Sequence, residues 1–489
     1  MGSSNDALAT QMTAAEAVLA IPESIARADG IIGLRWDGDD LVIGLPESLE
    51  HDASQQLLAK VQSASALCLR ELRVPDDELR ELIDLVFGDT RVTSDALPTI
   101  TDGSDGPIAD LVTEILDRAV RMRASDIHIE PGEQELLVRV RVDGALEELT
   151  RQPMTVAAPI VSRLKVLAQM NIVERRLPQD GQFGVRVADR DIDVRLATVA
   201  TLYGEKAVMR LLDTRRPAVD ITELGMHDLA LDRFQHMLRA NYGMIVAAGP
   251  TGAGKTTTLQ CALRDINTPL RNVSTLEDPV EYVVDGINHI PVNEAIGAGF
   301  ATQLRAILRQ DPDVILIGEV RDTETAKIGV QAALSGRLVL TSLHAQDAIS
   351  VIYRLFHLDV EPHLVAASLR GVVAQRLLRR VCKFCAQSYQ ASASERLLLG
   401  VEYGDLWLRR GIGCALCRGT GYRDRVAAFQ VLDVTDELRD LIARRPPQGQ
   451  LLDAARAHGF ATIADEPLQL ARRGDTTVEE AMRLVGVDG

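Results

Sequence analysis

The segment Gly249–Thr256, with the sequence Gly-Pro-Thr-Gly-Ala-Gly-Lys-Thr, constrains the fold of this chain more than any other stretch. It follows a strand-sized apolar run, Met244–Ala248, and precedes a helical pattern that begins at Thr256. A strand, a glycine-rich turn and a helix in this order form the Walker A phosphate-binding loop. Its glycines let backbone N–H groups converge on phosphates, and the helix N-terminus adds a partial positive charge. A chance glycine-rich turn is the weaker alternative in this context.

Each position of this loop has an expected role in binding ATP. Lys255 would neutralise the β- and γ-phosphates, and Thr256 would coordinate Mg²⁺. The other predicted nucleotide-binding residues are Gly249, Pro250, Thr251, Gly252, Ala253, Gly254 and Thr257. The sequence therefore predicts ATP and Mg²⁺ as ligands.

Strand-like apolar runs alternate with helical patterns from residue 220 to residue 380, which is typical of a doubly wound α/β domain. The runs are Met244–Ala248, Val273–Leu276, Val314–Ile317 and Leu338–Leu340. Ligands bind at the carboxyl ends of the strands in such folds. The polar residues that follow each run are therefore candidates for the site.

Two glutamates follow these runs and are candidates for the hydrolytic chemistry. Glu277 follows the second run, and Glu319 follows the third run in a Walker B arrangement. Gly318 occupies the position where many P-loop proteins have aspartate, so Glu319 would act alone. His344 follows the last run and is a candidate sensor of the γ-phosphate. The alternatives are helix caps or surface ion pairs for the glutamates and a structural role for the histidine.

The remaining chain divides by pattern into further parts. Residues 1–88 are mostly helical with one short strand region, and residues 89–106 have the composition of a linker. Residues 107–212 combine an amphipathic helix with alternating strands, so we expect an α+β domain with an antiparallel sheet. A connector covers residues 213–219, and a helical region is expected at residues 426–489.

Four cysteines form two pairs within residues 381–425, which we expect to form a small subdomain. They are Cys382, Cys385, Cys414 and Cys417. Two Cys-x-x-Cys pairs are typical of a tetrahedral zinc site, in which four thiolates leave no open position. The predicted zinc is therefore structural. Four unligated thiols or a redox pair are the alternatives.

Charge and hydropathy limit the partners of the 489-residue chain. The formal net charge is −17 and the pI is about 5.1, which argues against nucleic acid as the main partner. Four arginines between residues 370 and 380 form a local basic cluster that reads as a solvated helix face. No apolar stretch approaches the ~18 residues that span a bilayer, so we expect a cytoplasmic protein held at the inner membrane by partners.

From about Ser125 to its C-terminus the chain resembles the secretion ATPase superfamily, specifically the type II secretion system ATPases and their pilus-assembly relatives. The resemblance rests on Ser125–Pro131, Arg139–Gly144, the Walker A loop, Leu276–Glu281, Leu308–Thr325 and the segment around His344. It implies a RecA-like P-loop ATPase domain preceded by a PAS-like α+β domain. It also implies a homohexameric ring, with Arg195 and Arg210 of the preceding domain reaching the nucleotide. Ordinary ion pairs in a sheet are the alternative for these arginines.

The N-terminal residues bear on which machine such an ATPase would drive. Ile21–Arg27 resembles the start of the domain that docks type II secretion ATPases onto the cytoplasmic part of an L-type membrane protein. This resemblance implies a motor for pseudopilus assembly that also acts on an F-type platform protein. A pilus or competence ATPase, a non-hydrolysing ATP-gated scaffold and a DNA translocase are the alternatives.

Overall fold

The computed structural model describes residues 14–65, 67–87, 105–187, 190–213, 220–401 and 403–486. The chain divides into two compact units. Unit 1 comprises Met1–Arg216, Val381–Ser388 and Arg410–Asp424, and unit 2 comprises Pro217–Arg380, Tyr389–Arg409 and Arg425–Gly489. Residues 89–104 of the predicted linker and residues 214–219 of the predicted connector lie outside the described residues.

The N-terminal part of unit 1 contains a small sheet with four helices. The helices are α1 (Ala14–Leu19), α2 (Glu23–Asp29), α3 (His51–Ser65) and α4 (Asp76–Phe87). The strands are β1 (Ile32–Asp37), β2 (Asp40–Pro46) and β3 (Cys68–Val74), with β1–β2 antiparallel and β2–β3 parallel. The prediction of a mostly helical part with one short strand region agrees with the four helices and with β1 and β2, but it missed β3. β3 escaped detection because most of its residues are exposed or half-buried at the edge of the sheet, so it lacks an apolar run.

The second part of unit 1 is an antiparallel sheet covered by helices. Its strands are β4 (Asp126–Pro131), β5 (Glu135–Val142), β6 (Ala145–Pro153), β7 (Gln179–Val187), β8 (Arg190–Thr201) and β9 (Gly204–Asp213), in the order β6-β5-β4-β9-β8-β7. Its helices are α5 (Asp105–Arg121), η1 (Met154–Val156) and α6 (Ala157–Leu167). Apolar residues of α5, α6 and the sheet share one buried core. The predicted α+β domain is confirmed, although β6 and α6 were not foreseen.

Unit 2 is built on a seven-stranded sheet in the order β12-β11-β13-β14-β10-β15-β18. The strands are β10 (Gly243–Ala248), β11 (Val273–Glu277), β12 (Ile287–Pro291), β13 (Val314–Ile317), β14 (Leu338–Leu343), β15 (Leu369–Val381) and β18 (Tyr422–Asp433). β10 to β15 pair in parallel. The predicted α/β domain is therefore confirmed.

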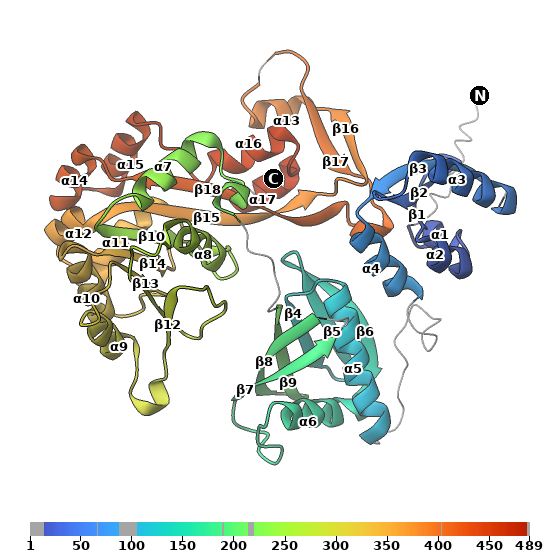
Figure 1. Cartoon of the computed structure of the whole chain (residues 1–489), viewed down its shortest axis with the longest axis horizontal. Helices are drawn as coiled ribbons and strands as arrows, with labels where there is room; N and C mark the ends of the chain where they lie inside the picture. The colour runs from blue at the N-terminus through green and yellow to red at the C-terminus, as the bar shows by residue number, and fades with distance from the viewer. Residues whose placement is uncertain are drawn as a thin grey trace. The chain divides into compact units, whose positions relative to one another are not determined.

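Helices cover both faces of this sheet (Figure 1). They are η2 (Ile221–Leu224), α7 (Asp228–Leu238), α8 (Lys255–Ile266), η3 (Glu294–Ile296), α9 (Phe300–Ile307), α10 (Thr323–Leu334), α11 (Ala348–His357) and α12 (Pro362–Ser368). Met244 and Val246 of β10 share a buried core with α9–α12, whereas Ile245 shares another with α7 and α8. The four strands β10, β11, β13 and β14 are therefore buried on both faces, which explains their continuous apolar sequences.

Two predicted boundaries after residue 380 need correction. The expected helical region at 426–489 begins with β18, which belongs to the large sheet, and only then continues as α14 (Asp436–Ala443), α15 (Gln448–Ala457), α16 (Asp465–Arg473) and α17 (Val478–Val485). The expected subdomain at 381–425 is divided, because residues 389–409 belong to unit 2. This region contains β16 (Ala386–Gln390), α13 (Ala393–Leu398), β17 (Trp407–Gly411) and η4 (Ala415–Cys417). Within the described ranges, no helix combines the length and apolar character that a bilayer crossing requires.

Candidate nucleotide and metal sites

The predicted phosphate-binding loop joins the end of β10 to the start of α8 in unit 2. Gly252 and Gly254 have φ angles of 76° and 88°, which lie in the region that favours glycine. A Cβ atom on Gly249 would lie 2.6 Å from the carbonyl oxygen of Gln375 and 2.8 Å from the Cβ of Ala253. The loop therefore requires its glycines for both conformation and close packing.

Lys255 lies across this loop at the first position of α8. Its Nζ donates hydrogen bonds of 2.9 Å to the carbonyl oxygens of Gly249 and Pro250. Burial lowers the pKa of Lys255; the nearby Glu319 carboxylate opposes this shift and Arg376 adds to it. The structure thus brings the predicted phosphate-binding lysine into the electrostatic range of the predicted catalytic glutamate.

Gln375 on β15 fixes the loop from the neighbouring strand. Its side-chain Nε2 donates to the carbonyl oxygen of Ala253 at 2.7 Å, and its Oε1 accepts from the hydroxyl of Thr258 on α8 at 2.8 Å. The side chain is buried. Sequence reasoning assigned no role to this residue, because the sequence around it does not show that β15 lies beside β10 and its loop.

Glu319 lies just beyond the end of β13, and hydroxyl groups of β14 hold the backbone beside it. Thr341 donates to the carbonyl oxygen of Ile317 at 2.8 Å, and Ser342 donates to that of Gly318 at 2.7 Å. The carboxylate of Glu319 is 2.5 Å from Arg321 and 3.9 Å from the Nε2 of His344. Two predicted site residues, Glu319 and His344, therefore lie together at the carboxyl edge of the sheet.

The packing around Gly318 explains why glycine precedes the glutamate. A Cβ atom on Gly318 would lie 3.1 Å from the carbonyl oxygen of Leu276 and 3.4 Å from the Cα of Glu277. The Gly318 amide also donates to the Leu276 carbonyl at 2.8 Å. The ends of β11 and β13 therefore approach closely, and an aspartate at position 318 would crowd them.

His344 is positioned to remain neutral near neutral pH. Burial lowers its pKa from the ordinary value of 6.5; Lys255, Arg321 and Arg354 add to the shift, and Glu319 opposes it. The ring therefore lies within electrostatic range of a cation, Lys255, and a carboxylate, Glu319, that both belong to the predicted site. This arrangement fits a group that responds to charge at the phosphate position.

Glu277 is the last residue of β11 and is buried. Its Oε1 lies 3.2 Å from the Nδ1 of His289 on β12, and the same nitrogen lies 2.9 Å from the hydroxyl of Thr275. Sequence reasoning missed His289, because it lies 12 residues from Glu277 in a segment without a recognised motif. The parallel register, in which Thr275 lies opposite His289, is what brings the ring to the carboxylate.

Arg195 and Arg210 lie opposite each other on β8 and β9 of unit 1. The Nε of Arg210 is 3.2 Å from Asp126. The Nε of Arg195 is buried without a hydrogen-bond partner in the described parts of the chain. The two arginines are adjacent, as a joint role would require, and they belong to a different unit from the phosphate-binding loop.

The arginines that precede the first cysteine pair lie on β15. The prediction that they form a solvated face of a helix was therefore wrong. Arg376 donates to the carbonyl oxygen of Gln346, and Arg370 donates to that of Tyr242. Arg379 lies 2.7 Å from Glu480, and Arg380 lies 3.6 Å from Asp475. Each of these cations has its own partner within unit 2, which weakens the case for a phosphate-binding basic face.

The four predicted zinc ligands converge in unit 1. All four sulfur atoms lie within 4.8 Å of one another and are buried. The Sγ–Sγ distances are 3.8 Å for Cys382–Cys414 and Cys385–Cys417, and 3.7 Å for Cys414–Cys417. A tetrahedral zinc with Zn–S bonds of about 2.3 Å separates its sulfurs by about 3.8 Å. The donor set and spacing therefore fit zinc.

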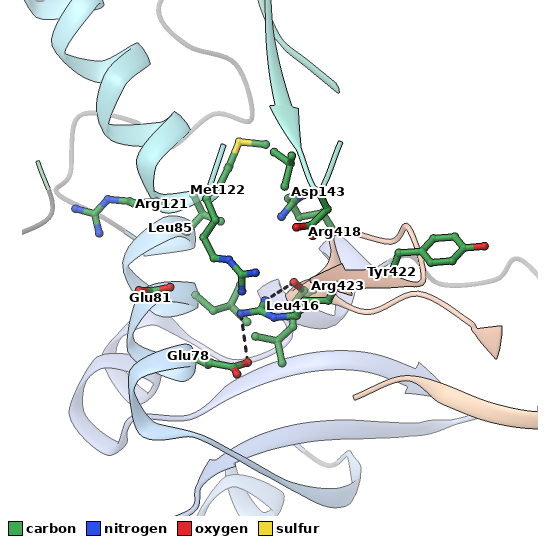
Figure 2. Close-up of a pocket in the computed structure, with 14 residues that line it drawn as sticks. Glu78, Glu81, Leu85, Arg121, Met122, Asp143, Leu416, Arg418, Tyr422 and Arg423 are labelled. Carbon is green, nitrogen blue, oxygen red and sulfur yellow. Dashed lines mark hydrogen bonds and ion pairs between the residues drawn. The ribbon is translucent and has the colours of Figure 1, made fainter. Parts of the chain in front are cut away.

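A small pocket borders the tetracysteine segment (Figure 2). Arg423 extends into it, donating to the carbonyl oxygen of Leu416 at 2.6 Å and lying 3.2 Å from Glu78 of α4. Arg418 likewise pairs with Glu147 at 3.0 Å. Because these arginines already have carboxylate partners, we interpret the pocket as a packing contact between segments of unit 1 and not as a ligand site.

Comparison with known proteins places these features in a family. The family model described as type II/IV secretion system protein matches residues 101–483. The chain is 41% identical over 438 residues to the type II secretion system protein HxcR of Pseudomonas aeruginosa, covering 90% of this chain and 89% of the relative. It is 42% identical over 381 residues to the type II secretion system ATPase E of Vibrio cholerae, covering 78% and 76%.

Two further comparisons concern the pilus branch and the fold. The type IV pilus assembly ATPase PilB of Myxococcus xanthus is 41% identical over 413 residues, covering 83% of this chain and 73% of the relative. The solved structure of the ATPase DotB of Legionella pneumophila superposes with a TM-score of 0.58 at 20% identity, covering 80% of this chain and 98% of DotB, which supports the ATPase fold alone. On the family match and these identities, the chain belongs to the type II/IV secretion system protein family.

Proposed function

We propose that this chain is the ATPase motor that energises type II protein secretion by driving assembly of a pseudopilus. The observation that carries the proposal is the convergence of Lys255, Glu319 and His344 at the carboxyl edge of the parallel sheet in unit 2. Relatives whose names specify type II secretion match most of the chain at about the same identity as the pilus relative.

The chemistry assigned to unit 2 is hydrolysis of ATP to ADP and phosphate. A water oxygen forms the new bond to the γ-phosphorus while the bond to the β,γ-bridging oxygen breaks. The Walker A loop and Lys255 hold the phosphates, and Glu319 orients the water and accepts its proton. Thr256 is the residue that would hold Mg²⁺, which when bound neutralises phosphate charge. Glu277 assists from the neighbouring strand end, and His344 reports the state of the phosphate.

The other parts of the chain receive supporting roles in this proposal. Arg195 and Arg210 contribute positive charge toward the γ-phosphate in a homohexameric ring and couple hydrolysis to domain movement. Their domain is PAS-like, which is supported by its single antiparallel sheet with α5 and α6 on the same core. The four cysteines hold a structural zinc. Residues 1–88 dock on the cytoplasmic part of an L-type inner-membrane protein, and the motor acts on an F-type platform protein from the cytoplasm.

The second candidate is a type IV pilus assembly ATPase with the same chemistry, which the identity to PilB favours. The experiment measures ATP turnover by the purified full chain, with and without the cytoplasmic domain of an L-type partner, together with co-elution. We expect a stable complex and faster turnover. Turnover without any complex would favour the pilus candidate, and loss of turnover in Lys255→Ala controls for a contaminating ATPase.

A further inference from the structure

We infer that His289 is a positioning residue that orients the carboxylate of Glu277 through a hydrogen bond from its ring, an inference that rests on the proposed role of Glu277. The ring lies on β12, and both it and the carboxylate are largely buried, with 9% and 7% of their side chains exposed. The ring contacts the side chains of Thr275 and Glu277 on β11 and the backbone amide of Val284 in the loop that follows β11.

The hydrogen bonds of the ring determine its tautomer. The backbone N–H of Val284 points to Nε2 at 3.0 Å, and a backbone amide can only donate. Nε2 must therefore carry a lone pair, and the ring proton of the neutral imidazole must be on Nδ1. That proton faces the Thr275 hydroxyl at 2.9 Å and Glu277 Oε1 at 3.2 Å. His289 thus shares one donated hydrogen bond between the Thr275 hydroxyl and the Glu277 carboxylate, and it accepts one from the loop.

This arrangement has a consequence for the carboxylate. A buried carboxylate needs hydrogen bonds to remain charged and fixed in direction. The ring binds Oε1 from β12, so we expect Oε2 to be the oxygen that Glu277 presents to the nucleotide. Glu319 follows the adjacent strand β13, and Gly318 packs within van der Waals distance of Glu277. His289 therefore sets the direction of the Glu277 carboxylate relative to Glu319, which follows the adjacent strand.

The ring also links this direction to the loop after β11. Val284 belongs to the segment between β11 and β12, which also contains Glu281. The same imidazole that orients Glu277 therefore holds this loop, through the opposite nitrogen. A purely structural role would depend on the loop contact alone, whereas a positioning role depends on the contact from Nδ1. The two contacts can be separated by substitution.

Asparagine and glutamine replace the two ring nitrogens selectively. The amide of His289→Asn reaches the position of Nδ1 and keeps a donor toward Glu277, whereas the amide of His289→Gln reaches the position of Nε2 and keeps the acceptor for Val284. His289→Leu removes both functions. Exposed His357 at the end of α11 provides a matched control as His357→Gln.

The test measures kcat and KM for ATP, and ADP affinity, in the full-length variants. We expect His289→Asn to keep kcat within about threefold, because the donor to the carboxylate persists. We expect His289→Gln and His289→Leu to lose about tenfold or more in kcat with KM and ADP affinity within about twofold, the effect of losing one hydrogen bond to a charged group. His357→Gln should match the wild type.

The reverse order would overturn the inference. If His289→Gln keeps kcat while His289→Asn loses it, the ring acts through the loop and does not orient Glu277. Equal kcat in all variants would also reject it. A wild-type chain that hydrolyses no ATP, alone or with its partner, would instead reject the proposed function, so the two failures are distinguishable.

Discussion

Gln375 and Ala253 are joined by a hydrogen bond of 2.7 Å from the side-chain amide of one to the carbonyl oxygen of the other. The glutamine belongs to β15 and the alanine to the phosphate-binding loop, so the loop is fixed by a strand that lies far away in sequence. The same amide accepts from Thr258 on α8. The conformation of the loop therefore depends on a residue outside its motif.

Replacing Gln375 should weaken nucleotide binding. Gln375→Leu leaves the Ala253 carbonyl and the Thr258 hydroxyl without their partner, which costs about 1–3 kcal/mol for each buried group left unpaired. We expect ATP affinity, measured by calorimetry, to fall at least tenfold. Thr476→Val, which removes another buried hydrogen bond in unit 2, should lower the unfolding temperature and leave ATP affinity unchanged. Equal ATP affinities in Gln375→Leu and the wild type would show that the contacts of Gln375 with Ala253 and Thr258 do not support nucleotide binding.

The Ser342 hydroxyl should matter for turnover and little for binding. It holds the Gly318 carbonyl immediately before Glu319, so Ser342→Ala frees the backbone that carries the catalytic carboxylate. We expect kcat to fall about tenfold, as for the loss of about 1.4 kcal/mol, with KM for ATP within about twofold. Ser335→Ala, which removes a similar hydroxyl contact at the end of α10, should keep kcat. If KM for ATP rises as much as kcat falls in Ser342→Ala, the hydroxyl contributes to ATP binding and not to turnover alone.

His344 should remain neutral to a lower pH than a histidine in the unfolded chain, although 56% of its side chain is exposed. Its pKa is lowered from 6.5, chiefly by burial and by Lys255. As the pH falls through 6.5, the unfolded chain takes up a proton before the folded chain does, so this group contributes stability above that pH and loses it below. We expect an NMR titration, assigned by comparison with His344→Gln, to give a midpoint below 6.5. A midpoint above 6.5 would contradict the claim that His344 is neutral in the folded chain near neutral pH.

Removal of zinc should destabilise unit 1 specifically. The four cysteines share a buried core with apolar residues of the N-terminal sheet and helices. We expect one zinc per chain by elemental analysis, and its loss in Cys417→Ser or after strong chelation. The apo-protein should show increased protease cleavage within residues 14–87 and unchanged ATP affinity in unit 2. Full protection of this segment without the metal would show that zinc does not support that core.

The placement of Lys255, Glu319 and His344 at one edge of the sheet could be predicted because it follows local rules. Each lies in the segment that comes after a fully buried strand, and parallel strands present their carboxyl ends at one edge. Their convergence follows from the order of strands alone. The need for glycine in the loop could also be predicted from the motif, because Gly252 and Gly254 adopt the left-handed conformation that the motif requires.

Contacts between distant strands could not be predicted from local patterns. His289 reaches Glu277 only through the register of β11 with β12, and Gln375 reaches Ala253 only because β15 lies beside β10. β3 was missed since its edge position leaves it without an apolar run. Likewise, β18 returns to the large sheet after the cysteine segment, a long-range pairing that helical patterns further along the chain concealed.

The central claim is that unit 2 hydrolyses ATP through Glu319. The most direct measurement compares ATP binding and single-turnover hydrolysis by the wild type and Glu319→Gln. Removing the carboxylate charge should lower the hydrolysis rate by a factor on the order of 10²–10³, while ATP affinity stays within about twofold because Lys255 and the loop remain. Hydrolysis at the wild-type rate by Glu319→Gln, with Lys255→Ala inactive, would contradict the account.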